Sequence, residues 1–396
     1  MTALFGTASS REVIRFLENA GYEAVFVGGA VRDHLLGKPA TDIDIATSAE
    51  PEEVKVVFPM TVDLGTDHGT VLVLMNGEPI EVTTYRTEGT YSDHRRPDEV
   101  RFVKSLQEDL RRRDFTMNAL AMTKDGELID LFDGKADMTN RMIKAVGNAS
   151  DRFTEDALRM FRAIRFSAVL DFDIEEKTLE AIQDHAEQIQ YVSVERIKVE
   201  MDKLLLGNNP IKAFHSIQNT RLNSYLPLFP SDIEKLNQTV PFKSAIEGWA
   251  CFMIAGNFSS TEITRAYKMS KVEKGFLTSV NEAYTNRMNR PFTIDDYYQN
   301  ELAVLLTTEK LFQSLHNDGG TLAAIDIKQV KQSLPIQSTA ELAVDGRTLM
   351  KWTGQSGGRW IGEWITKIEK AVLHGTCKNE PNEIKEWFLY EFNREK

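Results

Sequence analysis

Short apolar runs alternate with turn residues over the first third of the chain. Apolar positions with helical spacing extend from about Ser9 to Ala20, and the strand-like run YEAVFV (22–27) leads into Gly28-Gly29 and a further short helix. Two β-rich runs within residues 69–86 are joined by Asn76-Gly77, a strong signal of a hairpin turn. This alternation predicts a mixed α/β domain.

Three more segments are expected to complete this domain. TDIDIAT (41–47) is typical of a strand, and short strands are expected around ELIDLFDG (127–134). Between them, the pattern S-x-x-E from Ser105 to Glu108 resembles a capping box. It predicts that a helix begins there and contains RRRDFTMNALAM (111–122).

After Ala149 the pattern becomes helical, because apolar residues recur at intervals of three and four. The expected fold class is an α/β head, a mixed sheet with helices, followed by an all-helical remainder. Turn-rich stretches such as GNNP and HNDGG indicate boundaries between parts. The four expected parts are residues 1–148, 149–207, 208–320 and 321–396.

Composition narrows the class of protein. A chain of 396 residues, 42% of them hydrophobic, can form real cores. A net charge of −12 argues against a nucleic-acid partner held by bulk electrostatics, so a polyanion would need local basic patches. Cys251 and Cys377 are far apart and lack metal-ligand spacing. With no signal peptide or membrane span in the sequence, we expect a cytoplasmic protein.

Two aspartates in TDIDIAT are the first candidate chemistry. Alternate residues of a strand face the same side, so Asp42 and Asp44 are expected to project together. Paired carboxylates repel each other, and Mg²⁺ is the cation that suits one or two carboxylates and substrate phosphates. An ordinary surface strand is the alternative. Glu81 is either a third carboxylate from a neighbouring strand or a residue on a solvated face.

Gly28-Gly29, after a strand and before a helix, is the second candidate. Glycines there let backbone N–H groups approach a phosphate, and Arg32 adds a guanidinium nearby. The alternative is a tight strand-to-helix turn. In RRRDFTMNA, Arg113 is expected to meet a triphosphate, and Asp114 a ribose hydroxyl or a neighbouring arginine.

The stretch EDALRMFRAIRF (155–166) is the third candidate. On a helix its apolar residues face a core, whereas Glu155, Asp156, Arg159 and Arg162 share the opposite face. One interpretation is a solvated face with ion pairs worth ~0.2–0.5 kcal/mol each. The other is chemical, because a carboxylate only accepts hydrogen bonds and a guanidinium only donates them.

An Asp156–Arg159 pair would match cytosine and adenine, which both present an amine donor beside a ring-nitrogen acceptor. Uracil and guanine present the reversed order. Glu155 would hold Arg159 in plane, while Arg162 and Arg165 would meet phosphates.

Six ordered segments resemble the class II tRNA nucleotidyltransferases, or CCA-adding enzymes, of the polymerase β-like superfamily. They are GGAVRD (28–33), DID (42–44), EVTTYR (81–86), RRDFTMNA (112–119), EDALR (155–159) and VSVERIKVEMDKLL (192–205). A segment near the end, GRTLMKWTGQSGGRWIGEWITKIEKAVLHGTCKN (346–379), is similar to the family's tail.

The resemblance implies template-independent addition of C, C and A to the 3′ end of tRNA from CTP and ATP. It implies a catalytic head (1–148), a base-recognising neck (149–207), a body (208–320) and a tail (321–396) that binds the tRNA elbow. It places metal on Asp42 and Asp44, triphosphate or sugar contacts on Gly29, Arg32 and Arg113, and base or phosphate contacts on Asp156, Arg159, Arg162 and Arg165.

Two further segments bear on the substrates. The loop RTEGTYSDHRRP (86–97) ends in D-H-R-R-P, with Asp93, Arg95 and Arg96, and the resemblance links this loop to adenosine addition. Residues 345–379 carry six Lys/Arg and three acids, a patch suited to RNA phosphates. A helix, RWIGEWITKIEKAVL (359–373), is expected after Gly357-Gly358, whose N–H groups would meet a backbone phosphate. The alternative is an ordinary amphipathic helix with Trp360 and Trp364 in the core.

Three other functions stay open at this point. A poly(A) polymerase resembles the head, but its basic segment G-[RK]-[RK]-F is absent from VDLGTDHGTVLV (62–73). An enzyme that adds only part of CCA, such as only the final adenosine, is the second. A non-enzymatic RNA-binding module is the third, and the intact D-x-D with the glycine pair argues against it.

Overall fold

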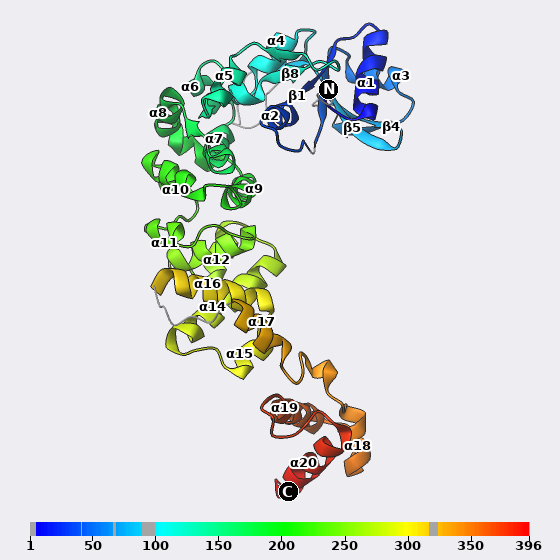
Figure 1. The fold of residues 1–396 in the computed structure, drawn as a ribbon, viewed down its shortest axis with the longest axis vertical. Coiled ribbons are helices and arrows are strands. Elements are labelled where there is room, and N and C mark those ends of the chain that lie inside the picture. Colours follow the sequence, from blue (N-terminus) through cyan, green and yellow to red (C-terminus); the bar gives the residue numbers. More distant parts are fainter. Residues whose placement is uncertain (1–4, 41, 66–68, 89–99, 317–323, 396) are drawn as a thin grey trace. The chain divides into compact units, whose positions relative to one another are not determined.

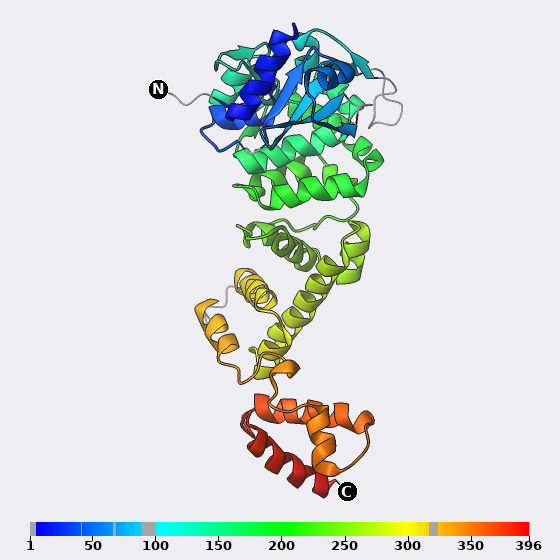
Figure 2. The ribbon, with the colours of Figure 1, turned by 90° about the vertical axis from the view of Figure 1, so that its right-hand side faces the viewer.

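The computed structural model describes residues 5–40, 42–65, 69–88, 100–316 and 324–395. Within it the chain forms two compact units (Figures 1 and 2). The first comprises Met1–Phe229, Val240–Ala245 and Ala266–Lys268, and the second Pro230–Thr239, Ile246–Arg265 and Met269–Lys396. The boundaries predicted near 148, 207 and 320 fall within these units and stay predictions, and the predicted part 208–320 has residues in both units.

A seven-stranded sheet organises the first unit, in the order β3-β4-β5-β2-β1-β8-β9. Strands β2 and β5 pair in parallel, whereas the other neighbours pair antiparallel, so the sheet is mixed as predicted. The strands are β1 Ala24–Val27, β2 Asp44–Thr47, β3 Thr61–Gly65, β4 Thr70–Met75, β5 Glu78–Thr84, β8 Leu120–Met122 and β9 Leu128–Asp130.

Helices lie on both faces of this sheet. On one face, α1 contacts β1 and β4 and buries Val13, Ile14 and Leu17, while α3 contacts β4 and β5 (Figure 1). On the other face, Val25 and Val27 of β1 pack with Leu110 of α4. The helices of this part are α1 Ala8–Asn19, α2 Gly29–Leu35, α3 Pro51–Val57, α4 Leu106–Arg111, the 3₁₀ helix η2 Thr116–Asn118, and α5 Gly134–Thr139.

The first helix and the hairpin match their predictions. Helix α1 ends at Asn19, and Gly21 two residues later has a φ of +91°. Asn76 and Gly77 have φ values of 52° and 81°, and they join β4 to β5. Two successive positive φ angles are the conformation that a two-residue hairpin turn requires.

The helix predicted over residues 111–122 is wrong. Helix α4 ends at Arg111, and Ser105 before it makes no capping bond, so the capping box is absent. Arg112–Met122 instead form a turn, η2 and β8. The backbone N–H of Thr116 donates to the carbonyl of Lys144, a tertiary contact that overrides the local pattern.

The rest of the first unit is mainly helical. Helices α7 and α9 pack against each other, and α7 also contacts α6 and α10. The elements are α6 Ala149–Glu155, α7 Leu158–Leu170, α8 Glu176–His185, η3 Ala186–Tyr191, α9 Val194–Leu205, α10 Pro210–Asn219 and η4 Leu222–Ser224. Two small strand pairs accompany them, β6 Arg86–Glu88 with β7 Val100–Phe102, and β10 Met142–Ile143 with β11 Asp173–Ile174.

The described part of the second unit is helical. Its last three helices, orange to red in Figure 2, share a core in which the Trp364 ring packs against Phe388 and Phe392. No described helix of the chain is long and apolar enough to cross a membrane. The elements are α11 Glu234–Asn237, α12 Ala245–Ala255, α13 Ser260–Ala266, α14 Lys271–Asn289, α15 Ile294–Gln299, α16 Leu302–His316, α17 Ala324–Gln332, η5 Thr339–Glu341, α18 Gly346–Thr353, α19 Arg359–Leu373 and α20 Pro381–Arg394.

The close contact between α5 and η2 generates a stability prediction. A Cβ atom on Gly134 would lie 2.3 Å from the carbonyl oxygen of Thr116. Gly134→Ala should therefore destabilise the fold by ~1–3 kcal/mol, measured by denaturant unfolding. Gly362→Ala in α19 is the control, because its Cβ would meet nothing within 4 Å. An unchanged free energy of unfolding for Gly134→Ala would contradict this packing.

Candidate active site

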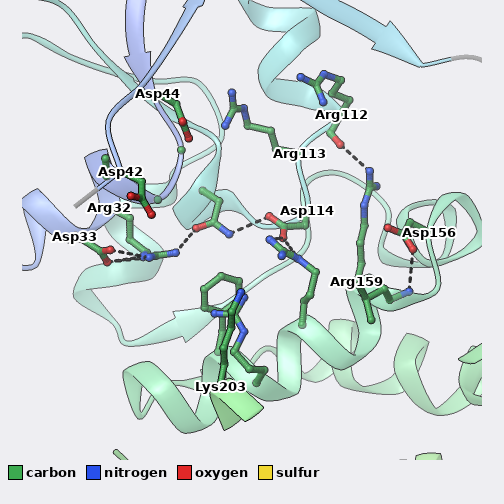
Figure 3. A pocket seen from close by; sticks show the side chains of 18 of the residues that line it. Arg32, Asp33, Asp42, Asp44, Arg112, Arg113, Asp114, Asp156, Arg159 and Lys203 are labelled. Atoms are coloured by element: carbon green, nitrogen blue, oxygen red, sulfur yellow. Dashed lines mark hydrogen bonds and ion pairs between the residues drawn. The ribbon is translucent and has the colours of Figure 1, made fainter. Parts of the chain in front are cut away.

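A cavity of about 660 Å³ opens between the sheet and helices α7 and α9 of the first unit (Figure 3). Its lining is dominated by charged side chains. Eleven of the predicted site residues line it: Gly28, Gly29, Arg32, Asp42, Asp44, Arg113, Asp114, Asp156, Arg159, Arg162 and Arg165. Residues distant in sequence therefore converge on one place.

The glycine pair forms the turn from β1 into α2 at one side of this cavity. Gly28 has a φ of +75°, which favours glycine, and a Cβ there would lie 3.2 Å from Arg113 Nη1. Helix α2 begins at Gly29, and no side chain caps its first N–H groups. Arg32 is buried and bonds Asp33. A tight turn and a place for an anion are therefore both present.

The two aspartates meet in the cavity, but not for the predicted reason. Strand β2 begins at Asp44, so Asp42 precedes the strand, and strand alternation does not align the two side chains. Both nevertheless line the cavity (Figure 3). Asp44 lies opposite Glu81 in the parallel register of β2 and β5, although Glu81 is exposed and outside the cavity lining.

Negative charge is concentrated at Asp44. Its pKa is raised from 3.8 to about 6 by burial, Glu81 and Asp42, while Arg113 acts in the opposite direction. Among the described residues, no three or more His, Cys, Asp and Glu side chains form a ready metal cluster. Two carboxylates that repel each other beside a cavity fit a hard divalent cation that takes its remaining ligands from substrate and water. The residues present therefore fit Mg²⁺.

The predicted helical face at residues 155–166 is only partly correct. Helix α6 ends at Glu155 and α7 begins at Leu158, and Asp156 between them is extended, with a φ of −140°. Asp156 Oδ1 accepts a bond of 3.1 Å from the Leu158 N–H. An aspartate before a helix start satisfies an otherwise unpaired N–H, which explains why the chain breaks there. Asp156 and Arg159 therefore do not share one helix face.

Arg159 and Glu155 make the contact expected of them. Arg159 Nη1 donates to Glu155 Oε2 at 2.6 Å, and Arg159 Nη2 donates to the carbonyl of Arg112 at 3.0 Å. Arg159 and Arg165 are 9% and 8% exposed, so for them the alternative of a solvated face is wrong. The proposed roles of these side chains stay predictions.

Arg162 and Asp114 form a pair between α7 and the segment before η2. Arg162 Nε and Nη2 donate to Asp114 Oδ2 at 2.9 and 2.7 Å. Burial alone would raise the pKa of Asp114, but Arg162 and a hydrogen bond from Asn118 lower it to about 2. Of the two partners considered for Asp114, the structure contains the arginine.

Arg165 is buried and bonded to α9, rather than lying at the exposed edge of the polar face of α7. Its Nε donates to Glu200 at 2.8 Å, and its guanidinium stacks 3.5 Å from the centroid of the Phe166 ring. Glu200 is buried as well. The cavity is therefore lined by guanidiniums that already have carboxylate partners.

Several lining residues were missed by the sequence interpretation. Arg196 pairs with Asp156 at 2.7 Å, and Lys203 lies farther along α9. Arg196, Glu200 and Lys203 are spaced i, i+4 and i+7, so the helical periodicity of 192–205 could have revealed a polar face. Asn118 lies in RRDFTMNA, but no role was predicted for it, because this segment was assigned to one continuous helix.

Two further sets of predicted residues belong to other segments of the chain. Asp93, Arg95 and Arg96 of the adenosine-addition loop lie outside the described residues. In the second unit, Trp364 is buried in the core, as the alternative interpretation expected, and Trp360 packs against the same cluster. The helix expected after Gly357-Gly358 is α19, and its Lys367 pairs with Glu395.

Three family models match the chain. Residues 24–144 match the poly A polymerase head domain, residues 171–231 match the probable RNA and SrmB-binding site of polymerase A, and residues 240–388 match tRNA nucleotidyltransferase domain 2. Together they span both units.

Known proteins are similar over nearly the whole length. A CCA-adding enzyme of Bacillus cereus is 41% identical, over 97% of this chain and 98% of that protein. The crystal structure of the Bacillus stearothermophilus CCA-adding enzyme in complex with CTP is 37% identical, with a TM-score of 0.84 over 98% and 97% of the two chains. A Thermotoga maritima CCA-adding enzyme complexed with tRNA, 23% identical over 96% and 94% of the chains, has a TM-score of 0.65 and shows the fold alone.

The raised pKa of Asp44 generates a pH prediction. A folded-state pKa above the ordinary value means that ionisation removes stability as the pH rises from 3.8 to about 6. Without metal, Asp44→Asn should therefore melt a few degrees higher than the wild type above this window, at about 2–4 °C for each kcal/mol. Below the window the difference should shrink.

The measurement is thermal unfolding in chelator at a series of pH values on both sides of about 6. Asp125→Asn is the control, because Asp125 is exposed and pairs only loosely with Lys124 at 3.2 Å. A pH-independent difference between Asp44→Asn and the wild type would contradict the assigned charge repulsion.

Proposed function

The chain belongs to the class II, bacterial-type CCA-adding enzymes, and we propose that it adds C, C and A in turn to the 3′ end of tRNA, from CTP and ATP and without a nucleic-acid template. The observation that carries this proposal is the charged cavity of the first unit. In it, carboxylates suited to a metal, a glycine turn suited to phosphate and an aspartate with arginines line one space.

The triphosphate is proposed to bind at one side of the cavity. Gly28 and Gly29 would offer backbone N–H groups, and Arg32 and Arg113 would offer guanidiniums. Arg113 Nε is buried without a hydrogen-bond partner among the described residues, which is consistent with a missing acceptor. These groups would fix the α-phosphate for attack by the tRNA 3′-hydroxyl, with pyrophosphate as the leaving group.

Asp42 and Asp44 would hold Mg²⁺, which when bound lowers the pKa of a coordinated hydroxyl and neutralises phosphate charge. Glu81 is kept as a proposed third carboxylate, because it lies opposite Asp44 in the register of the sheet. No covalent enzyme intermediate is needed.

Base choice is proposed to come from Asp156 and Arg159. Asp156 would accept a bond from the exocyclic amine of cytosine or adenine, and Arg159 would donate to the adjacent ring nitrogen. Arg196 supports Asp156 from α9, and Glu155 supports Arg159 from α6. Uracil and guanine would set donor against donor and acceptor against acceptor, which disfavours both.

Arg162 and Arg165 would complete the nucleotide site beside Asp114. Asp114, which pairs with Arg162, lies between Arg32 and Asp156 in Figure 3. The sugar of a nucleotide would likewise lie between its phosphates and its base. Arg165 would add positive charge toward phosphates.

The tRNA elbow is proposed to bind the tail, at residues 345–379. The six Lys/Arg and three acids of this segment support the proposal. Affinity should then fall with salt. A cytoplasmic location remains proposed, supported by the buried free thiols of Cys251 and Cys377.

One assay tests the proposed function. The protein is incubated with three tRNA primers, ending at the discriminator base, at −C and at −CC, with labelled CTP, ATP or both. We expect CCA, CA and A to be added, respectively, and then addition to stop. Long adenosine tracts would identify a poly(A) polymerase, addition only to the −CC primer would identify an A-adding enzyme, and no addition would overturn enzymatic function.

If Asp42 and Asp44 hold the metal, substitutions there should impair nucleotide addition without weakening tRNA binding. Asp42→Ala and Asp44→Ala should each lower nucleotide addition by about 10³-fold or more, because several kcal/mol of transition-state stabilisation are lost. The Kd for tRNA, measured by filter binding, should stay near the wild-type value. Asp125→Ala, at an exposed aspartate, is the matched control. Near-normal turnover by either active-site variant would contradict the assignment.

If Asp156 and Arg159 read the base, substitutions there should change the preference among the four nucleotides rather than lower the use of all four equally. Asp156→Ala and Arg159→Ala should narrow the kcat/KM ratios of CTP over UTP and of ATP over GTP by about tenfold, equivalent to ~1.4 kcal/mol. Arg162→Ala and Arg165→Ala should instead lower all four nucleotides in proportion. Wild-type ratios in the first two variants would mean that base choice arises elsewhere.

A further inference from the structure

A series of hydrogen bonds runs along the cavity from Arg32 to Arg162 (Figure 3). Arg32 Nη1 donates to Asn118 Oδ1 at 2.7 Å, and Asn118 Nδ2 donates to Asp114 Oδ1 at 2.9 Å. Asp114 Oδ2 in turn accepts both bonds from Arg162. Asn118 therefore bridges an arginine at the phosphate side and the carboxylate–guanidinium pair beside it.

Chemistry fixes the orientation of the Asn118 amide. A guanidinium has only donors and an ionised carboxylate only acceptors, so the amide oxygen must face Arg32 and the amide nitrogen must face Asp114. The pKa of Asp114, about 2, keeps it ionised at neutral pH. Asn118 is buried, and η2, which carries it, is fixed by the bond from Thr116 N–H to the Lys144 carbonyl. A shift of Arg32 or of Asp114 should therefore also change the hydrogen bond at the other end of the Asn118 amide.

Asp114 has no acceptor position to spare. Its carboxylate accepts from the Phe115 N–H at 2.8 Å, from Asn118 once and from Arg162 twice, four bonds in all, which fills the roughly four lone-pair positions of a carboxylate. A sugar hydroxyl that donates to Asp114 must replace one of these bonds. The bond from Asn118 is the one whose other end is held by Arg32.

We propose that Asn118 is a positioning residue that couples recognition of the triphosphate to recognition of the ribose 2′-hydroxyl. The inference rests on the proposed function, in which Arg32 meets the triphosphate and the Asp114–Arg162 pair meets the sugar. When phosphates engage Arg32, its bond to the Asn118 amide weakens, and Asn118 can yield its place on Asp114 to the 2′-hydroxyl. The 2′-hydroxyl then contributes more to the binding of a triphosphate than to that of a monophosphate.

Four cytidine nucleotides test this coupling at equilibrium, without catalysis. The Kd values of CTP, dCTP, CMP and dCMP are measured by competition with labelled CTP. In the wild type, the ratio of Kd for dCTP over CTP should exceed the ratio for dCMP over CMP by about fivefold, within the range of couplings between directly bonded groups. In Asn118→Ala the two ratios should become equal.

Asn118→Asp is the second variant, because it keeps the size and the acceptor for Arg32 but cannot donate to an ionised Asp114. It too should equalise the ratios. Asn140→Ala, at an exposed asparagine after α5, should keep the wild-type coupling. A purely structural role for Asn118 would weaken all four nucleotides together and leave the coupling unchanged.

The outcomes distinguish a wrong role for Asn118 from a wrong proposed function. Equal ratios in the wild type, or wild-type coupling in either folded Asn118 variant, overturn the role of Asn118 and leave the proposed function standing. Failure of the wild type to bind CTP at all would instead count against the proposed function.

Discussion

The architecture of the site depends on burying several guanidiniums side by side, which is tolerable only if each has its own carboxylate. On α7, Arg159 pairs with Glu155 of α6, Arg162 with Asp114 of the head, and Arg165 with Glu200 of α9. At the buried positions of Arg159 and Arg165, an unpaired charge would destabilise the fold by roughly 3–5 kcal/mol. The pairs thereby tie α7 to three different elements and define the cavity that they line.

The same pairing prepares the cavity for a charged ligand. Because the guanidiniums are held by carboxylates and by the Phe166 ring, little reorganisation is needed when phosphates or a base arrive. At the carboxylate side of the cavity, in contrast, like charges lie close together. Asp44 repels Asp42 and Glu81, and Arg113 acts in the opposite direction, so an added cation would stabilise this side. A bound cation at the carboxylates and bound phosphates at the guanidiniums would therefore complement the charges of the protein.

The sequence sufficed where local chemistry decides the structure, and it failed where distant contacts decide it. Asn76-Gly77, the Gly28-Gly29 turn and the helix at 359–373 follow from residues that few other conformations suit. Asp156 was misplaced because a helical wheel assumes an unbroken helix, whereas Asp156 lies between α6 and α7 and its side chain accepts from the Leu158 N–H. The partners Arg196 and Glu200 come from α9, and no local rule links α9 to α7. The convergence of Asp42 with Asp44 was foreseen, but for the wrong geometric reason.

The crystal structure of this protein with CTP would test the central claim most directly, because it shows which side chains meet the base. The account predicts that the cytosine N4 amine lies ~3 Å from the Asp156 carboxylate and that N3 accepts from Arg159, while the Arg162–Asp114 and Arg165–Glu200 pairs persist. A cytosine edge bonded instead to backbone groups or water, with Asp156 and Arg159 still turned to Arg196 and Glu155 alone, would contradict it.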